Sequence, residues 1–439
     1  MHKRYHSWGR YPRFDQSAVM LRWQTLPLPI PADSVKSYLP FGNGRSYGDV
    51  CLNRDGLLLD ARGLNHFMAF DTAKGILRCE SGVLLSEILA LTVPRGWFPW
   101  VVPGTKFVTV GGAIANDIHG KNHHSAGTFG CHVRSLELLR SNGERLHCSL
   151  NENPDWFRAT IGGLGLTGLI LWAEISLKQI NNPVMEVETI RYGQLDDFFE
   201  LSAESDKRHE YTVAWIDSMA KGKNLGRGHF IRANHAAPGI RQLSAPRYQA
   251  SVSVDLPFSL VTRTSARMFN FLYYRKQGKT QIKGLTHYEP FFFPLDQLLH
   301  WNRLYGPQGF HQYQCLLPLS DDGRSALRDV LKRGVHGEID CFLSVLKVFG
   351  EHQSPGLLSF PNAGVTVTLD LRHRGERTLR LLDDFDGVVR SVGGSVYPAK
   401  DARMSSSSFR HYFPQYLELE QYRDPNFSSS FWSRMTAKK

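Results

Sequence analysis

The sequence predicts an α+β protein of two domains, and three observations point to this class. The chain has 439 residues, long for a single core, and 42% hydrophobic against 21% charged residues leave apolar material for more than one. Before residue 180, short strand-like runs alternate with helical patterns. Beyond it, longer alternating runs separated by helices indicate a large antiparallel sheet with helices on one side.

The first half is dominated by short strands between Gly, Asn and Asp turns. Strands are expected over residues 56–60 and 75–82. The apolar spacing over 83–91 predicts an amphipathic helix, which Gly96 closes.

The run from Gly163 to Gly168 matches the pattern G-x-G-x-x-G, which is typical of Rossmann folds. That motif needs a strand before the glycines and a helix after them. Here a helix is expected over 153–160 and a strand over 169–177, which is the reverse order. We therefore do not expect a Rossmann fold.

The second half is richer in aromatic and charged residues. Period-two alternation predicts strands over 211–217, 311–317 and 364–371. Helices are expected over 324–334 and 377–392. Residues 219–260 lack periodicity and are rich in Gly, Ala, Pro and Arg, which predicts a mobile loop.

Composition narrows the possible partners and compartments. The net charge is +11, but the basic residues are dispersed and carry no nucleic-acid-binding signature, so nucleic acid is not expected. The charge fits either a basic solvated surface or attraction to an anionic membrane or phosphorylated substrate. Six scattered cysteines without a C-x-x-C pair argue against disulfides and fit a reducing compartment. Because no signal segment or long apolar run is visible, we expect a cytoplasmic or membrane-peripheral protein.

Two glycine-rich loops carry the strongest functional signal. Residues 42–49 read Gly-Asn-Gly-Arg-Ser-Tyr-Gly-Asp, and the stretch 104–118 contains a second run of small residues. Small residues let the backbone approach a flat ligand, and N–H groups in such turns hold phosphate oxygens. Two such loops suggest a dinucleotide.

A polar cluster directly follows the second loop. It contains His119, Lys121, His123 and His124. A metal site would need Glu, Asp or Cys partners at ligand spacing, and none accompanies these residues, so we expect no metal. We expect the cluster to lie in an active site beside the ligand.

Taken together, these motifs resemble the vanillyl-alcohol oxidase / p-cresol methylhydroxylase superfamily. Within it, the runs 119–124, 44–49 and Tyr397–Asp401 resemble the flavoprotein (oxidase) subunits of decaprenylphosphoryl-β-D-ribose 2'-epimerases. The likeness extends from Ser7 to Lys400.

The resemblance implies a domain organisation and a cofactor. Residues 1–182 would form the FAD-binding domain, 183–394 the substrate domain, and 395–439 a segment returning to the FAD domain. Several sugar and lactone oxidases of the superfamily have a flavin-linked histidine at the place of Arg45, so FAD is expected to bind non-covalently. The implied FAD contacts are Phe41, Gly42, Asn43, Gly44, Arg45, Ser46, Tyr47, Gly48, Asp49, Gly104, Thr109, Val110, Gly111, Gly112, Asn116, Asp117, Ile118, His119, Gly168, Leu169, Ile170 and Tyr397.

The resemblance also implies the catalytic and substrate-binding residues. His119 and Lys400 would be catalytic, with Lys400 either stabilising negative charge on the reduced flavin or, if desolvated, acting as a base. The implied substrate contacts are Tyr47, Lys121, Trp215, Gln312, Gln314, Lys347, Thr366 and Thr368. Mycobacterial members have an asparagine and a reactive cysteine in place of the two threonines, so covalent chemistry at that cysteine is not expected, and the sugar stays open.

The implied function is FAD-dependent oxidation of the 2-hydroxyl of a polyprenylphosphoryl-β-D-ribose, or a related lipid-linked phospho-sugar, to the 2-keto form. This is the first half of an epimerisation in cell-envelope arabinose biosynthesis. A separate NAD(P)H-dependent reductase would complete it, since no second nucleotide motif is present. The lipid-linked substrate implies contact with the membrane surface. Two alternatives remain, a soluble sugar or aldonolactone oxidase and a non-catalytic flavin-fold protein.

Overall fold

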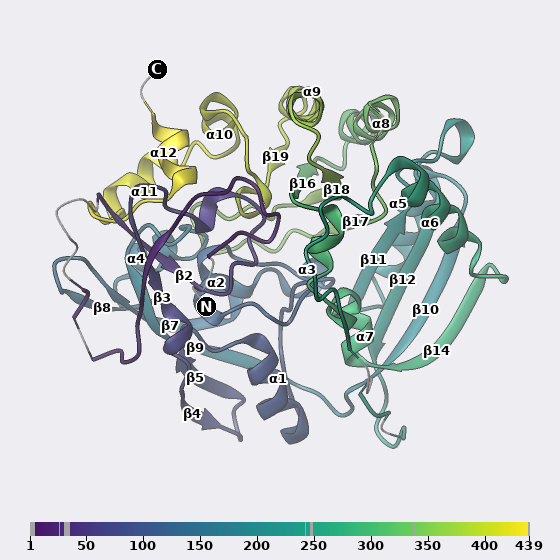
Figure 1. Ribbon diagram of the computed structural model, residues 1–439. Helices are drawn as coiled ribbons and strands as arrows, with labels where there is room; N and C mark the ends of the chain where they lie inside the picture. Colours follow the sequence, from purple (N-terminus) through teal and green to yellow (C-terminus); the bar gives the residue numbers. More distant parts are fainter. Residues whose placement is uncertain are drawn as a thin grey trace.

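The computed structural model describes residues 5–25, 27–29, 36–241, 243–245, 249–337 and 339–437. Within these residues, a six-stranded sheet lies in the first half of the chain and an eight-stranded sheet in the second (Figure 1). The predicted α+β class is confirmed. None of the helices in the described ranges is long and apolar enough to cross a bilayer.

The N-terminal half contains two sheets. A parallel three-stranded sheet has the order β1 (Ser17–Met20), β3 (Leu57–Asp60), β2 (Tyr38–Phe41). The six-stranded sheet has the order β4 (Phe67–Asp71), β5 (Ile76–Glu80), β9 (Leu169–Gln179), β7 (Val133–Leu139), β8 (Arg145–Ser149), and β6 (Trp97–Pro99) also pairs with β9. Four short helices accompany them: α1 (Leu85–Thr92), α2 (Val110–Ala115), α3 (His123–Ala126) and α4 (Pro154–Thr160). Their apolar sides close one core, in which Leu85, Ile88, Val110 and Phe157 are buried.

The eight-stranded sheet is antiparallel throughout. Its order is β14 (Gln281–His287), β10 (Val184–Tyr192), β12 (Gly228–His235), β11 (Tyr211–Ile216), β17 (Ser344–Phe349), β18 (Gly364–Arg372), β16 (Phe310–Leu317), β19 (Ser395–Val396). One face packs on α5 (Leu195–Ser205), α8 (Asp321–His336) and α9 (Glu376–Ser391), the last two lying along the top of Figure 1. The other face meets α6 (Arg263–Arg275), α7 (Tyr288–Phe292) and the glycine loops.

Most predicted elements are present, and one prediction is wrong. Residues 219–260 were expected to be a loop, yet β12 lies inside this range and in the interior of the sheet. Its hydropathy does not alternate because Arg232 is largely buried and is paired with Glu188 of β10, with an N–O distance of 2.6 Å. Further along, the two-residue strand β13 (Ala250–Ser251) pairs with β15 (Leu298–Leu299). The reversed helix–strand order around Gly163–Gly168 is confirmed by α4 and β9.

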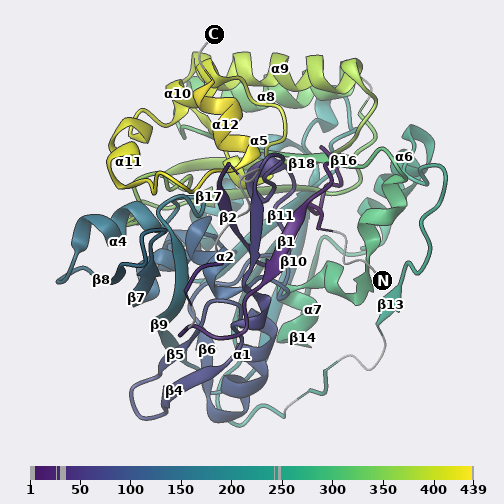
Figure 2. The same ribbon diagram turned by 60° about the vertical axis from the view of Figure 1, so that its left-hand side comes forward.

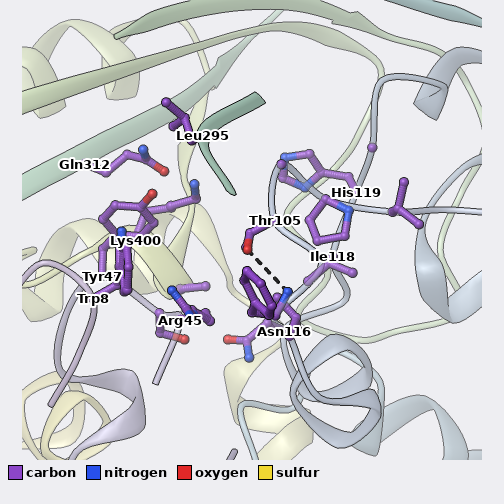
Figure 3. Close-up of a pocket in the computed structure, with 18 of the residues that line it drawn as sticks. Trp8, Arg45, Tyr47, Thr105, Asn116, Ile118, His119, Leu295, Gln312 and Lys400 are labelled. Carbon is purple, nitrogen blue, oxygen red and sulfur yellow. Dashed lines mark hydrogen bonds between the residues drawn. The ribbon is translucent and has the colours of Figure 1, made fainter. Parts of the chain in front are cut away.

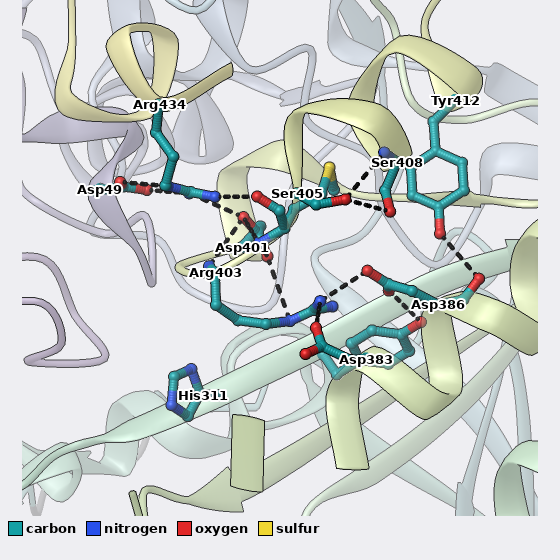
Figure 4. Close-up of polar contacts among 12 residues, drawn as sticks. Asp49, His311, Asp383, Asp386, Asp401, Arg403, Ser405, Ser408, Tyr412 and Arg434 are labelled. Carbon is teal, nitrogen blue, oxygen red and sulfur yellow. Dashed lines mark hydrogen bonds and ion pairs between the residues drawn. The ribbon is translucent and has the colours of Figure 1, made fainter. Parts of the chain in front are cut away.

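The C-terminal helices bring the chain back to its first half. They are α10 (Ser406–Tyr412), α11 (Tyr416–Tyr422) and α12 (Ser430–Thr436). Arg434 of α12 contacts Asp49 at 2.8 Å and Asp401 at 3.0 Å, as Figure 4 shows. Arg403 links the same turn to Asp386 of α9 at 2.7 Å. These buried ion pairs hold the residues next to Lys400 between the two halves of the protein.

Candidate active site

A cavity of about 970 Å³ lies between the two halves of the protein. Its walls are the two glycine loops, the turn after α4, the inner face of the large sheet, and the C-terminal turn that carries Lys400. In Figure 3, Tyr47, Gln312 and Lys400 lie on one side of this space, and Asn116, Ile118 and His119 on the other. The structure therefore brings together segments that are far apart in the sequence.

The two glycine loops pack directly on each other. The Asn43 side-chain amide donates to the carbonyl of Phe107 at 2.8 Å, and a Cβ on Gly42 would lie 2.4 Å from Thr109 Oγ1. Gly44 has φ +59°, which favours glycine. The N–H groups of residues 43–46 find no backbone acceptor among the described residues. A run of free N–H groups of this kind fits the phosphate oxygens of a dinucleotide.

Several polar atoms that line the cavity are buried and have no partner among the described residues. They are Arg45 Nε, Ser81 Oγ, Asn116 Oδ1, His119 Nδ1 and Gln312 Oε1. Arg45 is a half-buried cation whose guanidinium lies 4.1 Å from the centre of the Trp8 ring, and partial burial lowers its pKa. Because a buried polar atom without a hydrogen bond is costly, this arrangement suits a ligand with many polar groups and negative charge. FAD has this chemistry, and the cavity residues fit it.

Most of the predicted FAD contacts line the cavity. These are Phe41, Gly42, Asn43, Gly44, Arg45, Ser46, Tyr47, Gly104, Thr109, Gly111, Gly112, Asn116, Ile118, His119, Gly168, Leu169, Ile170 and Tyr397. Tyr397 also donates its hydroxyl to the Asn116 carbonyl at 2.6 Å and so joins the C-terminal turn to the second loop.

Four predicted contacts do not line the cavity: Gly48, Asp49, Val110 and Asp117. The Asp49 carboxylate pairs with Arg434, and the buried Asp117 carboxylate accepts hydrogen bonds from Gly130 N, Ser354 and Ser359. Gly48 packs against the Asp401 carbonyl, and Val110 belongs to the apolar core. These four residues belong to the glycine-loop motifs because they hold the loops in place, and they do not line the cavity themselves.

His119 lies in the cavity wall and is half-buried. Its Nε2 is 2.9 Å from the amide nitrogen of Gln314, whose amide also donates to Thr366 Oγ1 at 3.1 Å. When the amide donates to Nε2, the imidazole proton is on Nδ1. Burial holds the pKa of His119 well below its usual range, and the nearby His123 and Lys400 lower it further. His119 is therefore neutral at pH 7.

Lys400 lies on the opposite side of the cavity. Its ammonium is 4.6 Å from the centre of the Tyr47 ring. Burial lowers the pKa of Lys400, and the carboxylate of Asp370 opposes this shift. Burial also raises the pKa of Asp370. The hydrogen bond from Gln312, at 2.5 Å, and the charge of Lys400 partly offset this rise. Lys400 thus interacts electrostatically with a buried polar pair, Asp370 and Gln312.

The predicted substrate contacts all line the same cavity. Lys121 donates to the Phe292 carbonyl at 3.0 Å, and burial lowers its pKa to about 8. Lys347 contacts His124 Nδ1 at 2.7 Å, and burial lowers its pKa to about 7. The Trp215 indole donates to the Phe342 carbonyl at 3.0 Å, so its ring has a fixed orientation. Thr366 and Thr368 of β18 lie beside Gln314 of the neighbouring strand β16.

Sequence reasoning missed Asp370 and the aromatic residues of α6. Asp370 shares a strand face with Thr366 and Thr368, and the period of two could have identified it. Phe269 and Tyr273 of α6 also line the cavity, but nothing in their local sequence separates them from core residues.

The fold and this cavity define an FAD-dependent oxidoreductase. The FAD binding domain family matches residues 32–149, a range that contains both glycine loops. The decaprenylphosphoryl-β-D-ribose oxidase of Mycolicibacterium smegmatis is 36% identical to the chain over 416 residues, covering 90% of this chain and 88% of that protein. The chain belongs to the decaprenylphosphoryl-β-D-ribose oxidase family, which confirms the resemblance seen in its motifs.

Other relatives are less informative about substrate. An uncharacterised Streptomyces coelicolor protein is 32% identical over 376 residues, 80% of this chain and 100% of that protein. Bovine L-gulonolactone oxidase is 31% identical over 132 residues, 30% of this chain and 29% of that enzyme.

Proposed function

We propose that the protein oxidises the 2-hydroxyl of a polyprenylphosphoryl-β-D-ribose, or of a related lipid-linked phospho-sugar, to the 2-keto form. The relative from M. smegmatis is named for a substrate of this kind. The observation that carries the proposal to this chain is the division of the cavity-facing surface of the large sheet into a polar part and an apolar part.

The polar part lies on β16, β18 and β17. The registers Gln312↔Asp370, Gln314↔Thr368 and Lys347↔Thr366 put these side chains on one face of the sheet. A lysine, two amides and hydroxyl groups provide the donors and acceptors that a phosphorylated sugar requires.

The apolar part continues outward across the neighbouring strands. Through the registers Val213↔Ile231 and Thr189↔Ile231, the same face carries Val213, Ile231 and Val187 towards the edge strand β14. An apolar floor that begins beside the polar residues and runs to the sheet edge fits a prenyl chain attached to the phosphate. A free sugar or lactone would leave this floor uncovered, which disfavours the soluble-oxidase alternative.

FAD is held without a covalent bond in this proposal. At the place where related oxidases have a linking histidine, this chain has Arg45, which cannot form that bond. Contacts from the two glycine loops, Asn116 and the turn at 164–170 support binding. The proposed domain organisation of 1–182, 183–394 and 395–439 is supported by the positions of the two sheets and of the helices α10–α12.

Bound FAD would supply the acceptor for the hydride that leaves the oxidised carbon. Neutral His119 is the group that we assign to accept the hydroxyl proton. Because Nδ1 carries the imidazole proton, the acceptor is Nε2, where the substrate hydroxyl would take the place of the Gln314 amide. Lys400 is assigned as a cation that stabilises negative charge developing in the cavity. The Lys400 ammonium lies over the Tyr47 ring, and the Asp370 carboxylate favours the charged form of the lysine.

The proposal includes two partners. A separate NAD(P)H-dependent reductase would complete an epimerisation, and the substrate would be met at a membrane surface by a peripheral, cytoplasmic protein.

The proposal is tested by the visible spectrum of the purified holoenzyme under anaerobic conditions. A short-chain polyprenylphosphoryl ribose should bleach the flavin bands, whereas free ribose and aldonolactones should not. Bleaching by a free lactone alone would support the soluble oxidase, and no bleaching by any alcohol would support a non-catalytic protein.

A further inference from the structure

The segment 254–285 exposes an unusual amount of apolar side chain. Of the sixteen large hydrophobic residues exposed in the described chain, nine lie here: Val254, Phe258, Leu260, Met268, Phe269, Phe271, Leu272, Ile282 and Leu285. Concentration of exposed apolar residues in one segment indicates an interaction site rather than chance exposure.

Helix α6 shows this most clearly, because large apolar side chains lie on its solvent side. The side facing the protein holds the buried Asn270, whose amide donates to Asp217 at 3.2 Å and to the Cys341 carbonyl at 3.0 Å. The solvent side carries Met268, Phe271 and Leu272, which are 61%, 45% and 58% exposed. A helix with several large apolar side chains and arginines on its solvent side is typical of a surface that meets another apolar phase.

Basic residues surround these apolar side chains. The segment contains Arg263, Arg267, Arg275, Lys276, Lys279 and Lys283 against a single acidic residue, Asp255. Asp255 is already paired with Arg10, at 2.7 Å, and with Arg303, at 3.5 Å. The surface is therefore apolar and positively charged, which complements the headgroups and acyl boundary of an anionic bilayer.

The same surface borders the mouth of the active-site cavity. Phe269 and Tyr273 of α6 line the cavity, as does Lys276 directly after the helix, and Phe269 is 43% exposed. On β14, the register Thr189↔Ile282 puts Ile282 on the cavity side of the edge strand, where it is 46% exposed. Figure 2 shows α6 beside the chain that leads to it from β13, along one side of the molecule. The apolar floor of the cavity thus continues onto the exposed surface.

We propose that the surface formed by residues 254–285 docks on an anionic lipid bilayer, so that a prenyl chain enters the cavity along α6 without crossing water. This inference rests on the proposed function for its substrate. Continuity with the cavity is the reason for assigning a bilayer rather than a protein partner. Of the predicted loop 219–260, only residues 254–260 belong to this surface, since β12 occupies part of that range in the interior of the sheet.

The experiment is sedimentation of the FAD-loaded full-length protein with vesicles of phosphatidylglycerol and phosphatidylcholine. One variant combines Met268→Ser, Phe271→Ser and Leu272→Ser, and a second combines Arg267→Glu, Arg275→Glu and Lys279→Glu. None of these side chains lines the cavity. The matched control is Leu150→Ser with Leu417→Ser, which are 58% and 63% exposed elsewhere on the protein.

We expect vesicle binding to fall more than about tenfold in the apolar variant and more than about 100-fold in the charge variant. Binding of the control should be unchanged, and flavin content and Tm should match the wild type in all three. Vesicle binding by either variant at the wild-type level, equal loss in the control, or no binding by the wild type would overturn the inference.

Activity separates this inference from the proposed function. Turnover of a short-chain water-soluble analogue should be unchanged in both variants, whereas turnover of the long-chain substrate in vesicles should fall. If neither substrate is oxidised while vesicle binding follows the expected pattern, the proposed function is wrong and the docking surface stands.

Discussion

Removal of the Lys400 ammonium should slow substrate oxidation while leaving the cofactor in place. Lys400 lines the cavity and is half-buried, with its ammonium 4.6 Å from the Tyr47 ring centre. Few other cations are available to replace it, since Lys121 and Lys347 are held by the Phe292 carbonyl and by His124. Lys400→Ala therefore removes positive charge from the reacting region.

The magnitude follows from the burial of the site. Loss of one preorganised electrostatic stabiliser in a water-excluded site costs about 2.7–4 kcal/mol, or roughly 10²–10³ in rate. The variant also removes the charge that lowers the pKa of Asp370, so this carboxyl group becomes easier to protonate and does not add an unpaired negative charge. We expect the rate to fall within this range without loss of folding.

The assay is anaerobic stopped-flow measurement of flavin reduction by a short-chain polyprenylphosphoryl ribose. Lys400→Arg is the matched control, because it keeps the charge and should retain more activity than Lys400→Ala. Flavin content should be unchanged in both. An unchanged reduction rate in Lys400→Ala would refute the assigned role of this residue.

The remaining predictions concern proton transfer, cofactor attachment and folding. The rate of flavin reduction should fall as pH rises through the pKa of Lys400, which burial lowers from its usual 10.5; a rise over the alkaline range would instead identify Lys400 as the base. His119→Ala should reduce turnover with full flavin content, and unchanged turnover would remove it from catalysis. Acid precipitation should release all the yellow colour into the supernatant, and colour in the pellet would show a covalent bond. Arg434→Met leaves Asp49 and Asp401 buried without this partner and should destabilise the fold by about 3 kcal/mol, measured by urea denaturation, with Lys36→Met on the surface as a control that changes little.

Local motifs gave much of the site but not its boundaries. The glycine loops and the polar cluster at His119 were identifiable from their residue types and spacing, whereas Lys400 was identified only through the family resemblance. Asp49 and Asp117 belong to the same motifs, yet the structure uses them to fix the loops. A motif contains both residues that line the cavity and residues that hold the loops in place, and only the three-dimensional structure shows which is which.

Tertiary pairing explains what local sequence could not predict. Strand β12 has no regular alternation because Arg232 is satisfied by Glu188 on a neighbouring strand distant in sequence. The apolar residues of helix α6 recur with the period of a helix, but the side of the helix that faces water depends on how it packs on the sheet. In both cases the deciding contact lies far along the chain.

The central claim is oxidation at C2 of a lipid-linked phospho-ribose, and product analysis tests it most directly. The holoenzyme would be mixed with a short-chain polyprenylphosphoryl ribose, and the product trapped by reduction with borodeuteride. The proposed function predicts deuterium at C2 of the sugar, in step with flavin bleaching. Deuterium at another carbon, or bleaching without any label in the sugar, would contradict it.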